Sequence, residues 1–300
     1  MLVSTSYLMS CSSLKSQIRI AFELKRLAKL LCLSSIDEIN WSHFTRADVI
    51  DLLGCPELRK RKAATQNFTL NVIKRLCEEA CYAQLMPENL YLSIKRIPNF
   101  RGIRCQKLAC LSKNDIFKMF ASCINEGSLK GIRDAAILAV GLGCGLRRSE
   151  IAELRITNID FTSSLIRVLG KGNRERYIGL NPVVRNYLLR WLRIRGLDGI
   201  ANCFVPMNRN GEPIKTRALN DESVYLVVQR RSILALGYAI TTHDLRRNFA
   251  SHMLANHVDI NTLRVVMGHS DIRTTQIYDH RDELSRIATV SRISFLPLVT

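Results

Sequence analysis

The segment Thr242-His243-Asp244-Leu245-Arg246-Arg247-Asn248-Phe249-Ala250-Ser251-His252 carries the pattern from which the rest of the chain can be interpreted. At about 100° per residue, a helix that begins at His243 gathers one apolar face from Leu245, Phe249, Ala250, Met253 and Leu254. Arg246 projects near the middle of this face, and His243 reaches the same point from one turn earlier. A guanidinium among apolar neighbours needs an anionic partner. An ion pair with Glu150 or Asp244 would supply one, and so would an anionic ligand.

Two histidines, an arginine and a tyrosine lie within 36 residues at this end of the chain. Gly268-His269 and Tyr278 follow the first helix, while Arg147 and Lys171 upstream add positive charge. These are the groups required for attack of a tyrosine hydroxyl on a phosphodiester. With a pKa near ~10, tyrosine is a poor nucleophile unless nearby positive charge lowers that value. Taken singly, each histidine could be a satisfied core or surface group, and Lys171 an exposed turn lysine.

Four segments in order give the chain a family resemblance. The run 242–252 resembles the H-x-x-R box of the tyrosine site-specific recombinases, the phage integrase and Xer superfamily. Cys144–Glu150 resembles the GLRxSE box of that family, Leu169–Arg176 its GKGxKxR hairpin, and Met267–Tyr278 its LGH…TxxxY box. The resemblance covers about 104–280, whereas the preceding residues match only in being basic and helical.

The resemblance implies a catalytic set, namely Arg147, Lys171, His243, Arg246, His269 and Tyr278. The forked guanidinium groups of the two arginines suit the non-bridging oxygens of a phosphodiester transition state. His269 would donate a further hydrogen bond to the phosphate, and His243 would orient or deprotonate the nucleophile. In the family, the hairpin lysine protonates the departing 5′-hydroxyl, and Tyr278 is the nucleophile.

Several neighbouring residues have supporting or structural interpretations. Glu150 can brace Arg147 or form a plain helix salt bridge, and Asp244 is the second supporting residue. Arg247 is excluded from the site by helical spacing, whereas the choice of Arg147 over Arg148 rests on the family box. The other histidines and tyrosines are expected to be structural, with strand and helix packing for Tyr177 and Tyr187; the histidines are His43, His252, His257 and His280.

The expected reaction leaves a 3′-phosphotyrosyl bond and a free 5′-hydroxyl, and a second 5′-hydroxyl then reverses the step. Bond energy stays in the covalent link, so the resemblance implies no cofactor and no metal, in agreement with a sequence that has no P-loop or convincing metal-ligand cluster. The expected partners are double-stranded DNA with a specific recombination site, a homo-tetramer on two duplexes, and accessory DNA-bending proteins. A type IB topoisomerase-like enzyme and a catalytically inactive DNA-binding relative remain as alternatives.

Net charge supports a polyanionic partner. The 44 Lys+Arg residues against 26 Asp+Glu residues give +18, although charge of this size also keeps a basic protein soluble. The break at Pro98–Gly102 predicts two domains, a helical core-type DNA-binding domain over 1–103 and a catalytic domain over 104–300. In the first domain, the basic run Arg59, Lys60, Arg61 and Lys62 is expected to contact phosphate or to form a solvated face.

The predicted fold class is mainly α with a small β-sheet, in a two-domain clamp whose catalytic domain is mixed α/β. Helices are expected over 14–32, Arg46–Leu53, from the basic run to about Ala83, after an N-cap at Ser112, over Ile132 to about Leu142, from Asn181-Pro182 to Arg195, and near 220–235, 243–255, 260–267 and 272–279. Residues 165–180 are predicted to form a β-hairpin that turns at Gly170-Lys171-Gly172-Asn173.

Three further features complete the expectations. The ten cysteines include no CxxC pair, and no signal peptide or membrane-length apolar run is evident, which indicates a reducing cytoplasm. The family resemblance implies a nucleoid-associated protein of prokaryotic or phage origin. The apolar tail over 293–299 would dock on a neighbouring protomer or on its own domain. Asn256-His257 replaces the common Asn-Gly of the family at a position that often needs a left-handed backbone.

Overall fold

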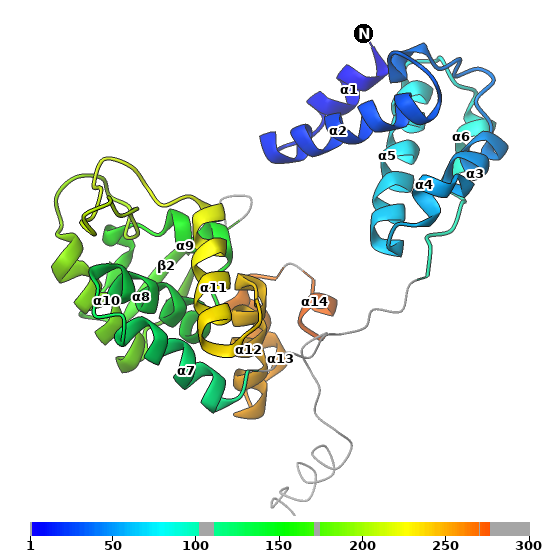
Figure 1. The fold of residues 1–300 in the computed structure, drawn as a ribbon. Coiled ribbons are helices and arrows are strands. Elements are labelled where there is room, and N and C mark those ends of the chain that lie inside the picture. Colours follow the sequence, from blue (N-terminus) through cyan, green and yellow to red (C-terminus); the bar gives the residue numbers. More distant parts are fainter. Residues whose placement is uncertain (1, 102–110, 171–174, 270, 277–300) are drawn as a thin grey trace, which may run out of the picture. The chain divides into compact units, whose positions relative to one another are not determined.

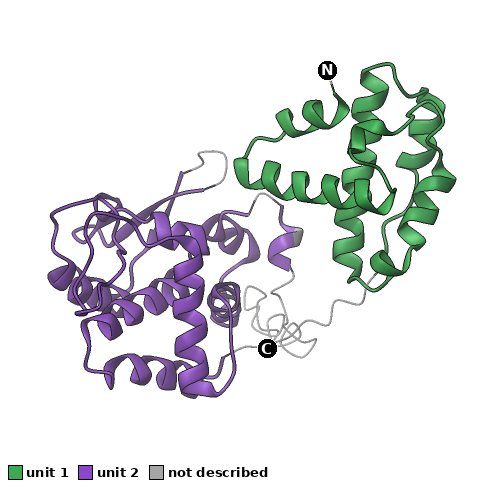
Figure 2. Cartoon of the chain, turned by 45° about the horizontal axis from the view of Figure 1, so that its top comes forward, with its two compact units in different colours: residues 1–106 green, residues 107–300 purple. Residues whose placement is uncertain are grey.

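The computed structural model describes residues 2–101, 111–170, 175–269 and 271–276 (Figure 1). Within these segments the chain is mainly helical and has one small antiparallel sheet, which confirms the predicted fold class. The chain divides into two compact units, 1–106 and 107–300 (Figure 2). The boundary that we expected near residue 103 lies outside the described residues.

The N-terminal unit is a bundle of helices around one long central helix. Its helices are α1 (Val3–Met9), α2 (Leu14–Leu30), α3 (Arg46–Gly54), α4 (Pro56–Arg59), α5 (Ala63–Tyr82) and α6 (Glu88–Lys95), with a 3-10 turn η1 (Ile36–Glu38). One face of α5, including Leu70, Ile73 and Leu76, forms the centre of the core. Ser13 caps α2, and a Thr45–Asp48 capping box starts α3.

The C-terminal unit is built around α8. Its helices are α7 (Lys113–Ile124), α8 (Leu129–Cys144), α9 (Arg148–Glu153), α10 (Pro182–Arg195), α11 (Asp221–Leu236), α12 (Thr242–Ala255), α13 (Ile260–Met267) and α14 (Arg273–Gln276), with a 3-10 turn η2 (Ile156–Asn158). Every residue of α8 from Ala135 to Gly141 is buried, because α7, α10, α11 and α12 all pack against it. A helix covered all round reads as continuously apolar, as the sequence does here.

A buried ion network ties α7, α8 and α11 together. Asp134 is fully buried, and its two carboxylate oxygens accept from Arg133 at 2.7 Å and from Arg231 at 2.8 Å. Arg231 also donates to the carbonyl of Ser122 and pairs with Glu126. Asp134, Arg133 and Arg231 are all buried away from water. The carboxylate and the two guanidinium groups therefore compensate one another's loss of hydration.

The sheet has strand order β1-β2-β3, from β1 (Ile159–Asp160), β2 (Leu165–Leu169) and β3 (Glu175–Gly179). The β2–β3 pairing confirms the predicted hairpin strands, while the turn 171–174 lies outside the described residues. Alternation buries Ile166, Val168, Arg176 and Ile178 and leaves the other face exposed. Our prediction of strand packing for Tyr177 is wrong: the residue is 60% exposed, because it lies on the face opposite Ile178.

The helix predictions agree with the structure to within a few residues at most ends, with larger differences at α5, α8 and the last helix. Asn181 caps α10 with Pro182 as its first residue, and a Ser112–Asp115 capping box starts α7. Tyr187 of α10 is partly buried and packs on Phe120, with ring centroids 4.8 Å apart. The expected last helix is described only as far as Gln276. Across the described ranges, no helix has the length and apolar character needed to cross a membrane.

Candidate active site

Arg147 is positioned by the sharp end of α8. Gly145 closes that helix with a left-handed φ of +61°, and a Cβ there would lie 2.4 Å from the Phe249 ring of α12. The chain then turns, and Arg147 becomes the N-cap residue of α9. The carboxylate of Glu150 accepts from the Arg147 backbone N–H at 2.7 Å and from Nη1 of its guanidinium at 2.8 Å.

Arg246 is buried on α12, as its place on the apolar face predicts. The residue is 3% exposed, and Leu245, Phe249 and Ala250 around it are buried as well. Its Nη1 donates to the carbonyl of Gly145 at 2.6 Å, and its Nη2 donates to the carbonyl of Met267. This one side chain therefore joins the end of α8 to the end of α13.

The two acidic partners considered for Arg246 differ in position. Glu150 lies near it, with Arg246 Nη1 3.9 Å from Oε2. Asp244 instead starts α12 in a capping box, where its Oδ2 accepts from the backbone N–H and hydroxyl of Thr241 at 2.9 and 2.7 Å. Its other oxygen lies 3.9 Å from Arg247. The supporting role that we expected for Asp244 is thus that of a helix cap.

His269 is held at the end of α13 in a defined tautomer. Gly268 closes α13 with a φ of +62°, and the next residue places its Nε2 3.0 Å from Nη2 of Arg246. An arginine N–H only donates, so this Nε2 must be the acceptor. The proton then resides on Nδ1, which lies 2.9 Å from Oγ1 of the buried Thr275 and donates to it.

The protonation state of His269 follows from this setting. Burial lowers its pKa to about 4, and the positive charges of Arg246, Arg147 and Arg176 act in the same direction. The imidazole is therefore neutral at neutral pH. His243 lies at the surface in the first turn of α12. Neighbouring protein atoms nevertheless shield part of its ring from water, which lowers the pKa of His243. The positive charge of Arg247 lowers this pKa further.

Arg147, Arg246, His269 and Glu150 form one cluster with Arg176, and we call it the arginine cluster. The sequence alone assigned no role to Arg176. Its Nη1 and Nη2 donate to the two carboxylate oxygens of Glu150 at 2.9 and 2.8 Å, and its Nε donates to the carbonyl of Val266 at 2.8 Å. Burial by itself would raise the pKa of Glu150. The hydrogen bonds and charges of Arg176 and Arg147 outweigh that effect and lower the pKa to about 2.

The structure brings together three of the six expected catalytic residues. Arg147 Nη2 donates to the carbonyl of Gly268 at 2.8 Å, next to the His269 that contacts Arg246. His243 lies one turn before Arg246 on α12. When His243 is protonated, its positive charge lowers the pKa of His269 further. Lys171 and Tyr278 lie outside the described residues.

Geometry now separates Arg147 from its neighbour Arg148. The side chain of Arg148 pairs with Glu222 at 3.2 Å and with Asp221 at 3.5 Å, both at the start of α11. Its guanidinium also lies 5.7 Å from the ring centre of Tyr225. These contacts direct Arg148 to α11, whereas Arg147 bonds to Glu150 and Gly268 in the cluster.

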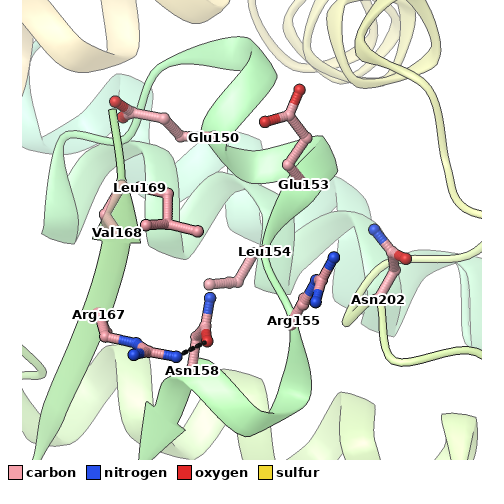
Figure 3. Close-up of a pocket in the computed structure, with 9 residues that line it drawn as sticks. All are labelled: Glu150, Glu153, Leu154, Arg155, Asn158, Arg167, Val168, Leu169 and Asn202. Atoms are coloured by element: carbon pink, nitrogen blue, oxygen red, sulfur yellow. Dashed lines mark hydrogen bonds between the residues drawn. The ribbon is translucent and has the colours of Figure 1, made fainter. Parts of the chain in front are cut away.

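A pocket of about 230 Å³ lies beside the cluster rather than in it (Figure 3). It is lined by Glu150, Glu153, Leu154, Arg155, Asn158, Arg167, Val168, Leu169 and Asn202. Of the residues in the cluster, Glu150 borders it, whereas Arg147, Arg246 and His269 do not. The arginine cluster therefore does not lie in this pocket. Among the residues with described positions, no group of three His, Cys, Asp or Glu side chains could hold a metal ion.

In the N-terminal unit, the basic run begins at Arg59, the last residue of α4, and ends at Lys62, just before α5. Arg59, Lys60 and Lys62 are exposed, while Arg61 is partly buried and pairs with Glu57 at 3.3 Å. The turn is held by Gln66, whose Nε2 donates to the backbone carbonyls of Leu58, Arg59 and Arg61. The run thus presents three exposed cationic side chains on an ordered turn.

Comparison with known proteins agrees with these observations. The model of the phage integrase family matches residues 109–284, which include the whole arginine cluster. The chain belongs to the phage integrase family. Tyrosine recombinase XerC of Stutzerimonas stutzeri (strain A1501) is 38% identical over 150 residues, and XerC of Pseudomonas putida (strain W619) is 36% identical over 150 residues. Each match covers 50% of this chain and 48% of the relative, so the chain spans about half the length of these relatives.

Solved structures show that the fold of this phage integrase family member is shared more widely. An integrase of transposon Tn1549 in complex with transposon right end DNA has a TM-score of 0.72 at 18% identity, covering 98% of this chain and 99% of that one. A λ integrase dimer bound to a core site has a TM-score of 0.69 at 15% identity, covering 92% and 93%. At these identities the similarity concerns the fold.

Proposed function

We propose that this chain is a site-specific DNA recombinase that cuts and rejoins DNA strands through a 3′-phosphotyrosyl intermediate. The observation that carries the proposal is the meeting of Arg147, Arg246 and a neutral His269 at one place. Thr275, bonded to His269, lies three residues before Tyr278 in the sequence. The XerC relatives are named as tyrosine recombinases.

The arginine pair supplies the phosphate site. Arg147 is about one-third exposed, with its side chain at 36%, and Arg246 aims its guanidinium at the same loop. Both can donate forked hydrogen bonds to the non-bridging oxygens, whose charge grows in the transition state. Glu150 neutralises only part of this charge, so the cluster attracts a phosphate.

His269 must change its hydrogen bonding when phosphate binds. In the structure its Nε2 accepts from Arg246, so it carries no proton for a phosphate oxygen. A phosphate that takes over the Arg246 N–H leaves Nε2 free to carry a proton, either by tautomer exchange or by proton uptake. The hydroxyl of Thr275 suits both states, because it can accept from Nδ1–H or donate to bare Nδ1.

The chemical step that we propose is balanced within the site. The Tyr278 oxygen bonds to phosphorus and passes its proton to His243, the P–O5′ bond breaks, and Lys171 protonates the departing 5′-oxygen. A 5′-hydroxyl of a second strand then attacks the phosphotyrosyl bond and releases Tyr278. No net bond energy is lost, so the reaction requires no cofactor.

For the whole molecule we propose a DNA clamp that acts as a tetramer on two duplexes. The 1–106 unit would be the core-type DNA-binding domain, with Arg59, Lys60 and Lys62 as phosphate contacts, and the 107–300 unit the catalytic domain. Structural neighbours include a XerH recombinase bound to its difH substrate and the λ integrase dimer on a core site. By the same analogy, we propose cytoplasmic action on a specific DNA site, with accessory DNA-bending proteins.

A nicked suicide duplex tests the proposal. Its sequence would come from random-sequence DNA selected by the wild-type chain, with the protected bases mapped by footprinting. Wild-type protein should form a covalent complex that survives denaturing electrophoresis, and Tyr278→Phe should form none. A complex with Tyr278→Phe would refute the assignment of the nucleophile. Relaxation of supercoiled DNA without any sequence requirement would instead favour a type IB topoisomerase, and specific binding without a complex an inactive relative.

A further inference from the structure

Arg176 stands out as a charged side chain on the buried face of the β-hairpin. It is 9% exposed and lies on β3 between Val168 of the neighbouring strand and Ile178, which are both buried. A guanidinium at such a position is costly unless its charge is compensated. Glu150, whose side chain is 4% exposed, provides the compensation through both carboxylate oxygens.

All three nitrogen atoms of this guanidinium are committed to protein acceptors. Two bond to Glu150, and Nε bonds to the carbonyl of Val266 in α13. Arg176 is also nearly inaccessible, whereas the side chain of Arg147 is about one-third exposed, so Arg176 is less suited than Arg147 to contact a phosphate directly. Its part in the cluster must be exerted through the groups that it holds.

Glu150 is the point where three guanidinium groups compete. Arg147 Nη1 lies 2.8 Å from Oε1, Arg176 occupies both oxygens, and Arg246 Nη1 stays 3.9 Å from Oε2. One negative charge faces three positive ones in a buried setting. The arginine that binds the carboxylate of Glu150 most strongly decides how much of its negative charge acts on the other two guanidinium groups. Those two groups can then interact more strongly with a phosphate.

Arg176 also packs against Gly268, the residue before His269. A Cβ at Gly268 would lie 3.1 Å from Nη1 of Arg176, and the φ of +62° at that glycine disfavours other residues as well. The carbonyl of the same glycine accepts from Arg147. The hairpin, the α13–His269 loop and the start of α9 therefore meet at this guanidinium.

We propose that Arg176 is a positioning residue: it bonds to both oxygens of Glu150 and so limits how strongly this carboxylate binds Arg147 and Arg246. It also fixes strand β3 against the end of α13 and the His269 loop. This inference rests on the proposed function, since it assigns Arg176 a part in the same strand cleavage. Without Arg176, the whole charge of Glu150 would act on Arg147 and Arg246 and hold their guanidinium groups more tightly.

A double-substitution cycle tests the proposal. The rate of covalent complex formation on the nicked suicide duplex would be compared for wild type, Arg176→Gln, Glu150→Gln and the double variant, with DNA binding measured for each. Arg176→Gln should slow the reaction on the order of 10²-fold, as expected for displaced catalytic groups, and leave DNA affinity within about threefold. Adding Glu150→Gln should recover about tenfold, because a neutral amide no longer attracts the two arginines. Arg167→Gln, an exposed arginine on the other face of the same hairpin, is the matched control and should react at the wild-type rate.

The cycle separates the possible outcomes. A double variant no faster than Arg176→Gln would mean that Arg176 only supports the fold, and this inference would be overturned. Reaction of Arg176→Gln at the wild-type rate would overturn it too. Absence of a covalent complex with the wild-type chain would instead remove the proposed function, and the inference with it.

Discussion

At the scale of single residues, the surroundings of His269 have a testable consequence for the proposed phosphate site. Its pKa is lowered to about 4 by burial and three arginines, and its Nε2 is occupied by Arg246. Anionic DNA would offset those arginine charges and restore the affinity of the ring for a proton. Under the proposed function, His269 would therefore become a hydrogen-bond donor only when the phosphate is bound.

We expect His269 to be neutral, with the proton on Nδ1, in the DNA-free protein from pH 8 down to about 5. Because its pKa in the folded state is below that of the unfolded chain, its contribution to stability is present above pH 6.5 and is lost as the pH falls towards 4. Histidine ¹⁵N NMR over this range measures both the pKa and the tautomer. Titration near pH 6.5, or a proton on Nε2 without DNA, would contradict this account.

The backbone conformation of His257 affects the stability of the fold. It adopts a left-handed φ of +62° after α12, and the N–H of Val258 reaches back to the carbonyl of Met253 at 3.1 Å. His257→Gly should raise the free energy of unfolding by about 0.5–1 kcal/mol, since glycine relieves a left-handed strain of about 1–2 kcal/mol but has a more flexible unfolded state. Asn256→Gly is the control, because its φ of −89° suits ordinary residues, and it should not stabilise. Urea denaturation compares the two, and equal effects would refute the argument.

At the scale of secondary-structure elements, α7, α8 and α11 depend on the buried Asp134 network. Asp134→Asn would leave Arg133 without its charge partner and Arg231 with Glu126 alone, and we expect a loss of about 3–5 kcal/mol in the free energy of unfolding. Asp198→Asn is the matched control: that carboxylate bonds to Lys215 at 2.7 Å but its side chain is 70% exposed, so the loss should be much smaller. Similar losses in urea denaturation would show that burial does not set the strength of these pairs.

Helices and strands could be predicted from the sequence where capping residues or hydrophobic periodicity marked them clearly. Asn181-Pro182 marked the start of α10, and alternation marked the β2–β3 strands. The short α6 and α9 gave too few turns for a clear period, because helices of that length rely on packing. The role of Arg176 could not be predicted, because it depends on a contact with Glu150 across 26 residues. One signal was available: an arginine at an inward position of an alternating hairpin.

The candidate site was predictable in its residue types but not in its connections. The spacing of the apolar residues placed Arg246 on the buried face of α12, where the structure has it. The sequence could not separate Arg147 from Arg148, since both follow the same turn. That choice is made by α11, whose Asp221 and Glu222 hold Arg148. Tertiary partners therefore decide which of two adjacent arginines faces the cluster.

At the scale of the whole molecule, the net charge of +18 predicts binding that depends strongly on salt. If the exposed Arg59 and Lys62 contact phosphates, replacing both with Gln should weaken DNA binding and reduce the salt dependence of log K by about 2. Arg61→Gln should have a smaller effect, since Arg61 already pairs with Glu57. Binding isotherms at several salt concentrations would measure the slopes. An unchanged slope in the double variant would show that this run faces solvent.

The central claim is that four segments of this chain converge on one phosphorus so that Tyr278 attacks it. The most direct measurement is mass spectrometry of the peptide that remains linked to DNA after reaction with the nicked suicide duplex and proteolysis. We predict a link between Tyr278 and a 3′-phosphate, with the exposed Tyr177 unmodified in the same sample. A link through any other residue, or to a 5′-phosphate, would contradict the account.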